Sequence, residues 1–383
     1  MKLKFGLLAR IITAIILAVI FGSFMPEWFV RIFATFNDIF GGLLNFVVPL
    51  IIIGFIAPGI AQLGQGSGKL LGLATFFAYF STIIAGLLAF FAASNLLPSF
   101  ISGQKASVED PSNFLAQGFF TIEFIPLMDV MAALVLAFIL GVGMTAVKST
   151  VLKKGFEEFN GIVEKVIAVI IIPLLPFHIF GIFLNMTFAG QVAKILSVFA
   201  VVFILILILH WIMLTIQYSV AGALNSKNPF KLLKTMLPAY FTALGTQSSA
   251  ATIPVTLQQA KKTGASDKVT DFTVPLFATI HLSGSTITIV SCAIGVMLMN
   301  GIEFTLPQML GFILMLGVTM VAAPGVPGGG VMAALGLLSS MLGFDETMLA
   351  LMIALYMAQD SFGTATNVTG DGALAMIVDK FSK

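Results

Sequence analysis

The sequence predicts an all-α protein that crosses a membrane many times, and three observations carry this prediction. Apolar residues make up 58% of the 383-residue chain, against roughly 45–50% in soluble proteins. Charged residues make up 9%, where about 25% is usual for a domain that faces water. The apolar runs are continuous and do not alternate with a period of two, which indicates helices and not a β-barrel. This composition excludes soluble enzymes, nucleic-acid-binding proteins and disordered chains.

The first 222 residues are expected to form six full-length spans of a single membrane domain that covers residues 1–383. A bilayer core about 30 Å thick takes roughly 20 helical residues to cross. Apolar runs of sufficient length occupy residues 6–25, 39–63, 70–97, 125–147, 162–187 and 193–222. Most Lys and Arg residues fall on the N-terminal side of these spans, and the positive-inside rule makes that side cytoplasmic. We therefore expect a multi-pass protein of the cell membrane with both termini in the cytoplasm.

The second half of the chain contains two short apolar segments that turn back at a tip. The tip of the first, residues 235–260, is Ser248-Ser249-Ala250-Ala251-Thr252-Ile253-Pro254, and the tip of the second, residues 308–343, is Pro324-Gly325-Val326-Pro327-Gly328-Gly329-Gly330. At 1.5 Å per residue each arm reaches only the bilayer midplane. Lipid cannot satisfy free backbone groups at that depth. We therefore expect two re-entrant helical hairpins whose tips line a cavity.

Each hairpin precedes a span that we expect to be interrupted. Residues 270–298 contain His281-Leu282-Ser283-Gly284-Ser285, and residues 347–378 contain Gly363 and Asn367-Val368-Thr369-Gly370-Asp371. A hairpin with an interrupted helix, found twice, predicts eight transmembrane helices plus two re-entrant hairpins arranged as inverted repeats. Paired interruptions of this kind point to the binding site of a transporter.

Two acidic residues, Asp360 and Asp371, lie deep within apolar sequence. With Thr364 and Asn367 they fall on one face of an α-helix. A carboxylate at the bilayer centre costs at least about 2.5–3.5 kcal/mol, and no Lys or Arg lies at that depth in the sequence. We therefore expect their partners to be cations from outside, namely a substrate ammonium, a metal ion or a proton. Oxygen-rich surroundings suit a hard cation such as Na⁺.

These residues carry a family resemblance. The two hairpin tips and the pattern Asp360, Thr364, Asn367 and Asp371 resemble the signature of the dicarboxylate/amino acid:cation symporters, the family of glutamate transporters and neutral amino acid exchangers. The resemblance covers nearly the whole chain. It implies a homotrimer of elevator-type transporters, with an amino acid as substrate and Na⁺ or H⁺ as coupling ion in place of any other cofactor. In each protomer a transport part, residues 70–97 and 229–378, would move through a scaffold, residues 1–69 and 114–222.

The resemblance also implies a set of site residues. Those for the substrate are Ser248, Ser249, Ser285, Val326, Gly330, Asp360, Gly363, Thr364 and Asn367, with Asp360 on the α-amino group. Those for Na⁺, several through backbone carbonyls, are Phe277, Thr279, His281, Met320, Val321, Ala323, Asn367 and Asp371. Candidates for a further cation or proton are Ser81, Thr82 and Ser283.

Departures from the family pattern bear on substrate and coupling. Gly363 stands where members with acidic substrates have an Arg, so no guanidinium would pair with a side-chain carboxylate, and we expect a neutral amino acid. Ser283 replaces an Asp that supplies a sodium site in the family. His281 could take up a proton there, because its unperturbed pKa of ~6.5 lies near working pH, or it could be a buried neutral side chain. Gln247, at the first tip, has no assigned role.

Other functions stay open at this point. A proton- or Na⁺-coupled symporter of dicarboxylates or acidic amino acids would use the same architecture. A channel would also use re-entrant loops, although it would need a polar lining along several spans, and the deep charges lie on one helix. An intramembrane enzyme is not expected, because no nucleophile with a base and no metal motif occurs at depth.

Overall fold

The computed structural model describes residues 7–63, 68–101, 115–190, 192–321, 323 and 327–382. Within these ranges every regular element is a helix, so the all-α prediction is confirmed. The first half contains α1 (Leu7–Gly22), α2 (Glu27–Leu63), α3 (Gly68–Ile101), α4 (Val130–Ala146), α5 (Thr150–Val166), α6 (Ile172–Phe188) and α7 (Val192–Asn225), with a π-helical turn, Ile167–Ile171, between α5 and α6.

Several helices run beyond the predicted spans. Helix α2 begins twelve residues before residue 39, because the polar residues Arg31, Asn37 and Asp38 do not stop a helix. Five stretches of the described residues are long and apolar enough to cross a membrane: residues 27–61, 69–100, 150–188, 195–225 and 267–299. Shorter apolar helices form α1, α4 and the second hairpin. These helices support a multi-pass membrane protein, and the number of eight spans stays a prediction.

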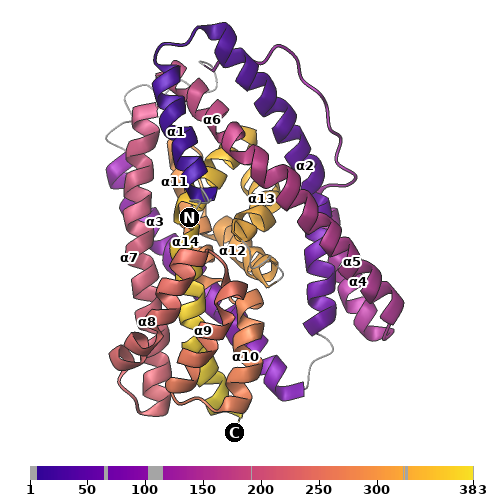
Figure 1. Cartoon of the computed structure of the whole chain (residues 1–383), viewed down its shortest axis with the longest axis vertical. Coiled ribbons are helices and arrows are strands. Elements are labelled where there is room, and N and C mark those ends of the chain that lie inside the picture. Colours follow the sequence, from indigo (N-terminus) through magenta and orange to yellow (C-terminus); the bar gives the residue numbers. More distant parts are fainter. Residues whose placement is uncertain are drawn as a thin grey trace, which may run out of the picture.

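Two helix pairs occupy the places of the predicted hairpins. The first pair is α8 (Pro229–Thr246) with α9 (Ser249–Lys262), and the second is α12 (Leu306–Met320) with α13 (Gly329–Leu342). The four arms have 14 to 18 residues, or roughly 21–27 Å at the α-helical rise. A bilayer core is about 30 Å thick. In Figure 1 the first pair lies in the lower half of the molecule and the second pair lies higher.

The span after the first hairpin is broken where the sequence predicted. It consists of α10 (Asp267–Ile280) and α11 (Ser283–Met299), separated by His281 and Leu282. His281 has extended backbone angles, φ −116° and ψ 97°. The break is narrower than expected, because residues 283–285 already form the first turn of α11.

The span after the second hairpin is not broken. Helix α14 (Glu346–Ser382) runs through 37 residues, so the interruption predicted at Gly363 and at residues 367–371 is wrong. The glycines there serve close packing and leave the helix intact. A Cβ added at Gly284 of α11 would collide with the Gly363 carbonyl oxygen, and a Cβ at Gly370 would lie 2.6 Å from Oε1 of Gln217 in α7.

Helix α14 lies at the centre of the bundle. It packs against α3, α7, α8, α9, α10, α11 and α13, and almost all of its side chains after the first turn are buried. Helices α2, α4, α5 and α6 pack in sequence along one side, with α2 and α5 on the right in Figure 1, and α6 also packs against α1. Helix α7 packs against α14, α11, α8 and α3, although the sequence grouped residues 193–222 with the scaffold.

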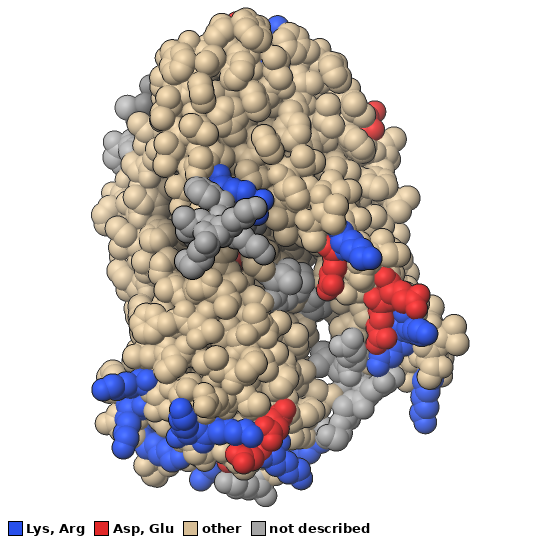
Figure 2. Space-filling model, viewed as in Figure 1, with Lys and Arg blue, Asp and Glu red and all other residues tan. Residues whose placement is uncertain are grey.

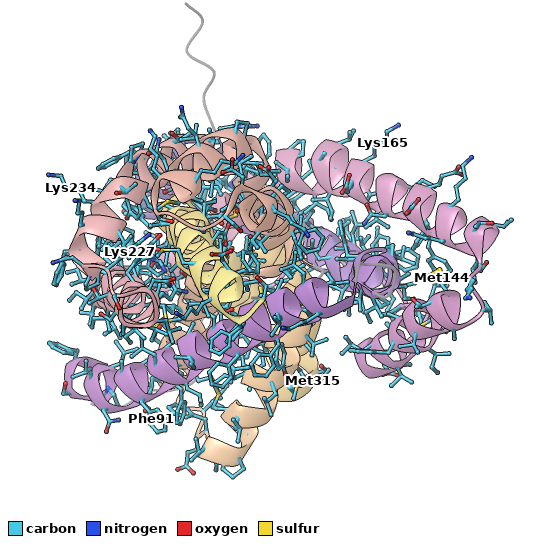
Figure 3. The ribbon with its side chains drawn as sticks, turned by 90° about the horizontal axis from the view of Figure 1, so that it is seen from below. Phe91, Met144, Lys165, Lys227, Lys234 and Met315 are labelled. Carbon is cyan, nitrogen blue, oxygen red and sulfur yellow. The ribbon has the colours of Figure 1, made fainter. Side chains whose placement is uncertain are left out.

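Basic side chains gather at one end of the molecule. Figure 2 shows Lys and Arg over the lower end, where α8, α9 and α10 lie, and again around the free end of α4 and α5. Figure 3, seen from that end, has Lys234 and Lys165 on opposite sides. This distribution has the form that the positive-inside rule expects of a cytoplasmic face.

The contact between α11 and α14 yields a test. Replacing Gly284 with Ala would place a methyl group against the Gly363 carbonyl oxygen. We expect the free energy of unfolding to fall by about 1–3 kcal/mol, the usual range for overpacking, with a lower midpoint of thermal unfolding in detergent. The control is Gly72→Ala in α3, where a Cβ would meet nothing within 4 Å. A Gly284→Ala variant that melts at the wild-type temperature would contradict the close contact.

Candidate functional site

The polar stripe of α14 is buried on one face of an unbroken helix. The exposed fractions are 3% for Asp360, 5% for Thr364, 2% for Asn367 and 1% for Asp371. Because α14 is continuous, the four side chains keep the helical spacing that the sequence predicted. Among the described residues no Lys or Arg forms an ion pair with either aspartate. The two carboxylates are therefore held by neutral donors and one histidine.

Asp360 contacts the second hairpin. Its Oδ2 accepts a hydrogen bond from the Gly328 backbone N–H at 2.7 Å, and Gly328 has the left-handed φ of 77° at the start of α13. Tyr356, one turn earlier on α14, donates its hydroxyl hydrogen to the Ser285 hydroxyl at 3.0 Å. A Cβ at Gly330 would lie 2.5 Å from the Tyr356 hydroxyl, so Gly330 lets the hairpin approach. Val326, which the sequence assigned to the substrate, lies outside the described residues.

Asn367 holds the first turn of α11. Its Oδ1 accepts from the backbone N–H groups of Gly284 at 2.7 Å and Ser285 at 3.3 Å. Its Nδ2 donates to the Ser285 hydroxyl at 3.0 Å. Helix α11 has no capping side chain of its own at Leu282, and free N–H groups at a buried helix start need partners. Asn367 therefore acts as a cap from the neighbouring helix, which ties Asn367 and Ser285 together as the sequence expected.

Asp371 faces the break between α10 and α11. Its Oδ1 lies 2.8 Å from Nδ1 of His281, and both side chains are buried, with 1% exposed. The other imidazole nitrogen, Nε2, lies 3.1 Å from the Ser81 hydroxyl of α3. The Oδ2 atom of Asp371 is buried and has no hydrogen-bond partner among the described residues. Such an orphaned carboxylate oxygen fits a cation ligand.

The remaining residues expected for Na⁺ are more scattered. The Phe277 carbonyl accepts from the His281 N–H at 2.9 Å, and Thr279 is exposed with its hydroxyl bonded to Leu276 of its own helix. Met320 is the last residue of α12, Val321 is its C-cap and Ala323 follows, in a region where backbone carbonyls lack regular helical donors; the Met320 carbonyl accepts from the Ala323 N–H at 3.4 Å. These carbonyls suit a hard cation. No contact between them and Thr279 occurs among the hydrogen bonds of the described residues.

The first hairpin tip is built by its own hydroxyls. The Ser248 side chain caps α9 by accepting from the Ala251 N–H at 3.2 Å, and Ser249 is buried in the first turn. Gln247 takes the left-handed conformation, φ 55°, that closes α8. Both hairpin arms pack against α14, so the tip residues share a neighbour with the polar stripe.

Sequence reasoning missed two polar residues of α7, Gln217 and Tyr218. Gln217 is buried and donates from Nε2 to the Ser81 hydroxyl at 3.0 Å, and Tyr218 donates to the Thr369 carbonyl at 2.6 Å. His210 reaches the Gly284 carbonyl at 3.0 Å, a contact of packing type as its apolar setting suggests. The sequence did contain a signal for these residues, because an amide (Gln217) and a phenol (Tyr218) are unusual inside a strongly apolar span.

Comparison with known proteins shows which family the chain resembles over its length. A model of the sodium:dicarboxylate symporter family matches residues 7–381. The serine/threonine transporter SstT of Acinetobacter baylyi is 27% identical over 405 aligned positions, which cover 100% of this chain and 98% of that protein. Excitatory amino acid transporter 1 of Bos taurus is 31% identical over 237 residues, 61% of this chain and 43% of that protein. An excitatory amino acid transporter of Caenorhabditis elegans is 27% identical, with 69% and 53% covered.

The chain thus spans nearly the full length of the bacterial relative but only 43% and 53% of the two animal ones. All of these relatives are named as transporters, and none as an enzyme, which agrees with the sequence prediction. The match over residues 7–381 shows that the chain belongs to the sodium:dicarboxylate symporter family, as its hairpin tips and its α14 stripe predicted.

Proposed function

We propose that this protein is a Na⁺-coupled secondary symporter that carries a small neutral amino acid across the cell membrane. The observation that carries the proposal is Asp360, a buried carboxylate that has only hydrogen-bond donors and no cationic side chain as partner among the described residues. A substrate ammonium supplies the missing charge. Membership of the family supports a coupled cation.

The surroundings of Asp360 suit an amino acid backbone. The ammonium would bind the Asp360 carboxylate and compete with the Gly328 N–H that now donates to it. The α-carboxylate would meet the hydroxyl of Thr364, one turn along α14, and the backbone N–H groups at the start of α13, where the helix dipole favours an anion. Asn367 contributes by holding α11, because its oxygen is already bonded there.

Gly363 supports a neutral substrate. A side chain at this position would point toward the Ser285 N–H and the Thr288 hydroxyl, at 3.5 and 3.6 Å from its Cβ. No guanidinium is available at this position to pair with a second carboxylate, so an acidic substrate would leave a charge unpaired. The serine/threonine transporter, which matches over the whole chain, is named for neutral amino acids.

The alternative substrate class is a dicarboxylate or an acidic amino acid. The family description names dicarboxylates, and several relatives are named as excitatory amino acid transporters. A channel is the alternative from another class, and it differs in that it would not support counterflow of a labelled solute.

The coupling ion is proposed to be Na⁺, bound at the unpartnered Oδ2 of Asp371 and at the carbonyls that end α12. A proton is the second candidate. We further propose a homotrimer of elevator-type protomers with cytoplasmic termini, in line with the basic lower end of the molecule (Figure 2). In that scheme α7 travels with the transport part, because Gln217 and Tyr218 bond to α3 and α14.

Asp360→Asn tests the substrate site. Loss of the negative charge removes the ion pair with the ammonium, which is worth about 1.5–3 kcal/mol for a hydrogen bond to a charged group. We expect the apparent substrate affinity to fall by about 10- to 100-fold. The assay is counterflow in proteoliposomes with a panel of labelled amino acids and dicarboxylates, with and without Na⁺. The control is Asp271→Asn. It removes a carboxylate that lies outside the site and pairs with Lys261 at 2.7 Å. Wild-type affinity in Asp360→Asn would overturn the proposal.

Gly363→Arg tests the substrate class. A guanidinium at this position could form a bidentate pair with a second carboxylate, so we expect the preference to shift toward aspartate, glutamate or another dicarboxylate. The control is Gly363→Gln, which adds a long polar side chain without a charge. It distinguishes the effect of the positive charge from the effect of filling the space beside Gly363. The measurement is the ratio of acidic to neutral uptake for the three proteins. A wild type that already prefers acidic substrates would support the alternative.

A further inference from the structure

The three hydroxyls that the sequence offered for a further cation all take part in hydrogen bonds within the protein. Ser81, Thr82 and Ser283 are all buried. The Gln217 amide nitrogen donates to the Ser81 hydroxyl at 3.0 Å and to the Ser283 hydroxyl at 3.3 Å. The Thr82 hydroxyl donates to the Ala78 carbonyl of its own helix. Each of the three hydroxyls is therefore already engaged by a protein group.

The imidazole of His281 fills the centre of the same cluster. Its Nδ1 meets Asp371 at 2.8 Å and its Nε2 meets Ser81 at 3.1 Å. The Gln217 amide nitrogen lies 3.4 Å from Nε2. Because an ionised carboxylate only accepts, Nδ1 of His281 carries the hydrogen that is donated to Asp371. The two hydrogens of the Gln217 amide are directed at the Ser81 and Ser283 hydroxyls, so the hydrogens of both side chains point at the oxygens of this cluster.

This polarity does not fit a cation among these residues. A hard cation is held by oxygen atoms whose lone pairs point toward it. Here the Gln217 amide hydrogens point at the Ser81 and Ser283 oxygens, and the Nδ1 hydrogen of His281 points at Asp371. The side chains that surround His281 come from α3 (Ser81), α7 (Gln217), α11 (Ser283) and α14 (Asp371), and the ion pairs of the described residues bring no Lys or Arg to them.

We propose that His281 and Gln217 permanently occupy the position beside Ser81, Thr82 and Ser283 that a further cation would take. This chain would then bind and couple one cation fewer than a relative with an acidic residue at position 283. The inference rests on the proposed Na⁺-coupled function. One carboxylate oxygen of Asp371 is bonded to His281, and the unpartnered Oδ2 is left for a single cation. Relatives that place a carboxylate at position 283 would have a second acidic ligand there.

The first experiment counts bound ions. Radioactive Na⁺ bound per protomer is measured for the purified full-length protein and for the double variant His281→Asn with Ser283→Asp, which replaces the imidazole and adds a carboxylate. We expect the double variant to bind about one more ion and its uptake to depend more steeply on Na⁺ concentration. His178→Asn, a buried histidine of α6 that bonds to Asn37, is the matched control and should bind the wild-type number. Equal ion counts in the wild type and a folded double variant would overturn the inference.

The second experiment needs no change in the site of the protein under test. The chain has three histidines, so nitrogen NMR of histidine-labelled wild type in liposomes resolves His281, assigned by its loss in His281→Asn. We expect the Nδ1 hydrogen bond to persist at saturating Na⁺. Its disappearance on adding Na⁺ would overturn the inference even where the double variant does not fold.

The two proposals fail separately. Neither the ion count nor the NMR spectrum requires transport. If the wild type binds about one ion fewer than the double variant but accumulates no solute with a Na⁺ gradient, the result contradicts the proposed function alone. If the wild type and the double variant bind equal numbers of ions and the wild type takes up solute normally, the result contradicts this inference alone.

Discussion

The burial of two carboxylates on one helix, with no Lys or Arg paired to them in the part of the chain that the structure describes, constrains the rest of this structure. An ionised carboxylate taken out of water needs hydrogen-bond donors and a counter-charge. Helix α14 lies at the centre of the bundle, where its neighbours supply donors: the Gly328 N–H at Asp360 and His281 at Asp371. These donors leave the negative charge in place and the Oδ2 atom of Asp371 without a partner among the described residues, and the proposed cation coupling and ammonium recognition rest on these two facts.

Close approach of the helices makes this arrangement feasible. Glycines at 284 and 370 remove the Cβ atoms that would meet Gly363 and Gln217. With backbones this near, the side chains of α3, α7 and α14 reach one another through hydrogen bonds at Ser81 and Thr369. In a membrane, where lipid is as apolar as the helix surfaces, such packing and polar contacts hold helices together.

Composition and pattern predicted the helical class, the two helix pairs, the break at His281 and the shared face of Asp360 and Asp371, because each depends on local sequence. The prediction of a break near Gly363 was wrong. A glycine in a helix can mark either an unwound segment or a close contact with another helix, and the packing of the neighbouring helix determines which one occurs. The His281 contact with Asp371 was also beyond the sequence. It joins residues 90 positions apart, and its partner Gln217 lies on a span that reads as lipid-facing.

The cap that Asn367 provides for α11 has a further consequence. Because the donor groups of Gly284 and Ser285 end on a side chain of another helix, the start of α11 has no independent stability at that point. Any rotation or sliding of α14 that withdraws the amide would expose unsatisfied backbone and fray the turn. The two helices are thereby obliged to shift as one rigid unit, with the polar stripe and the broken span kept in fixed register.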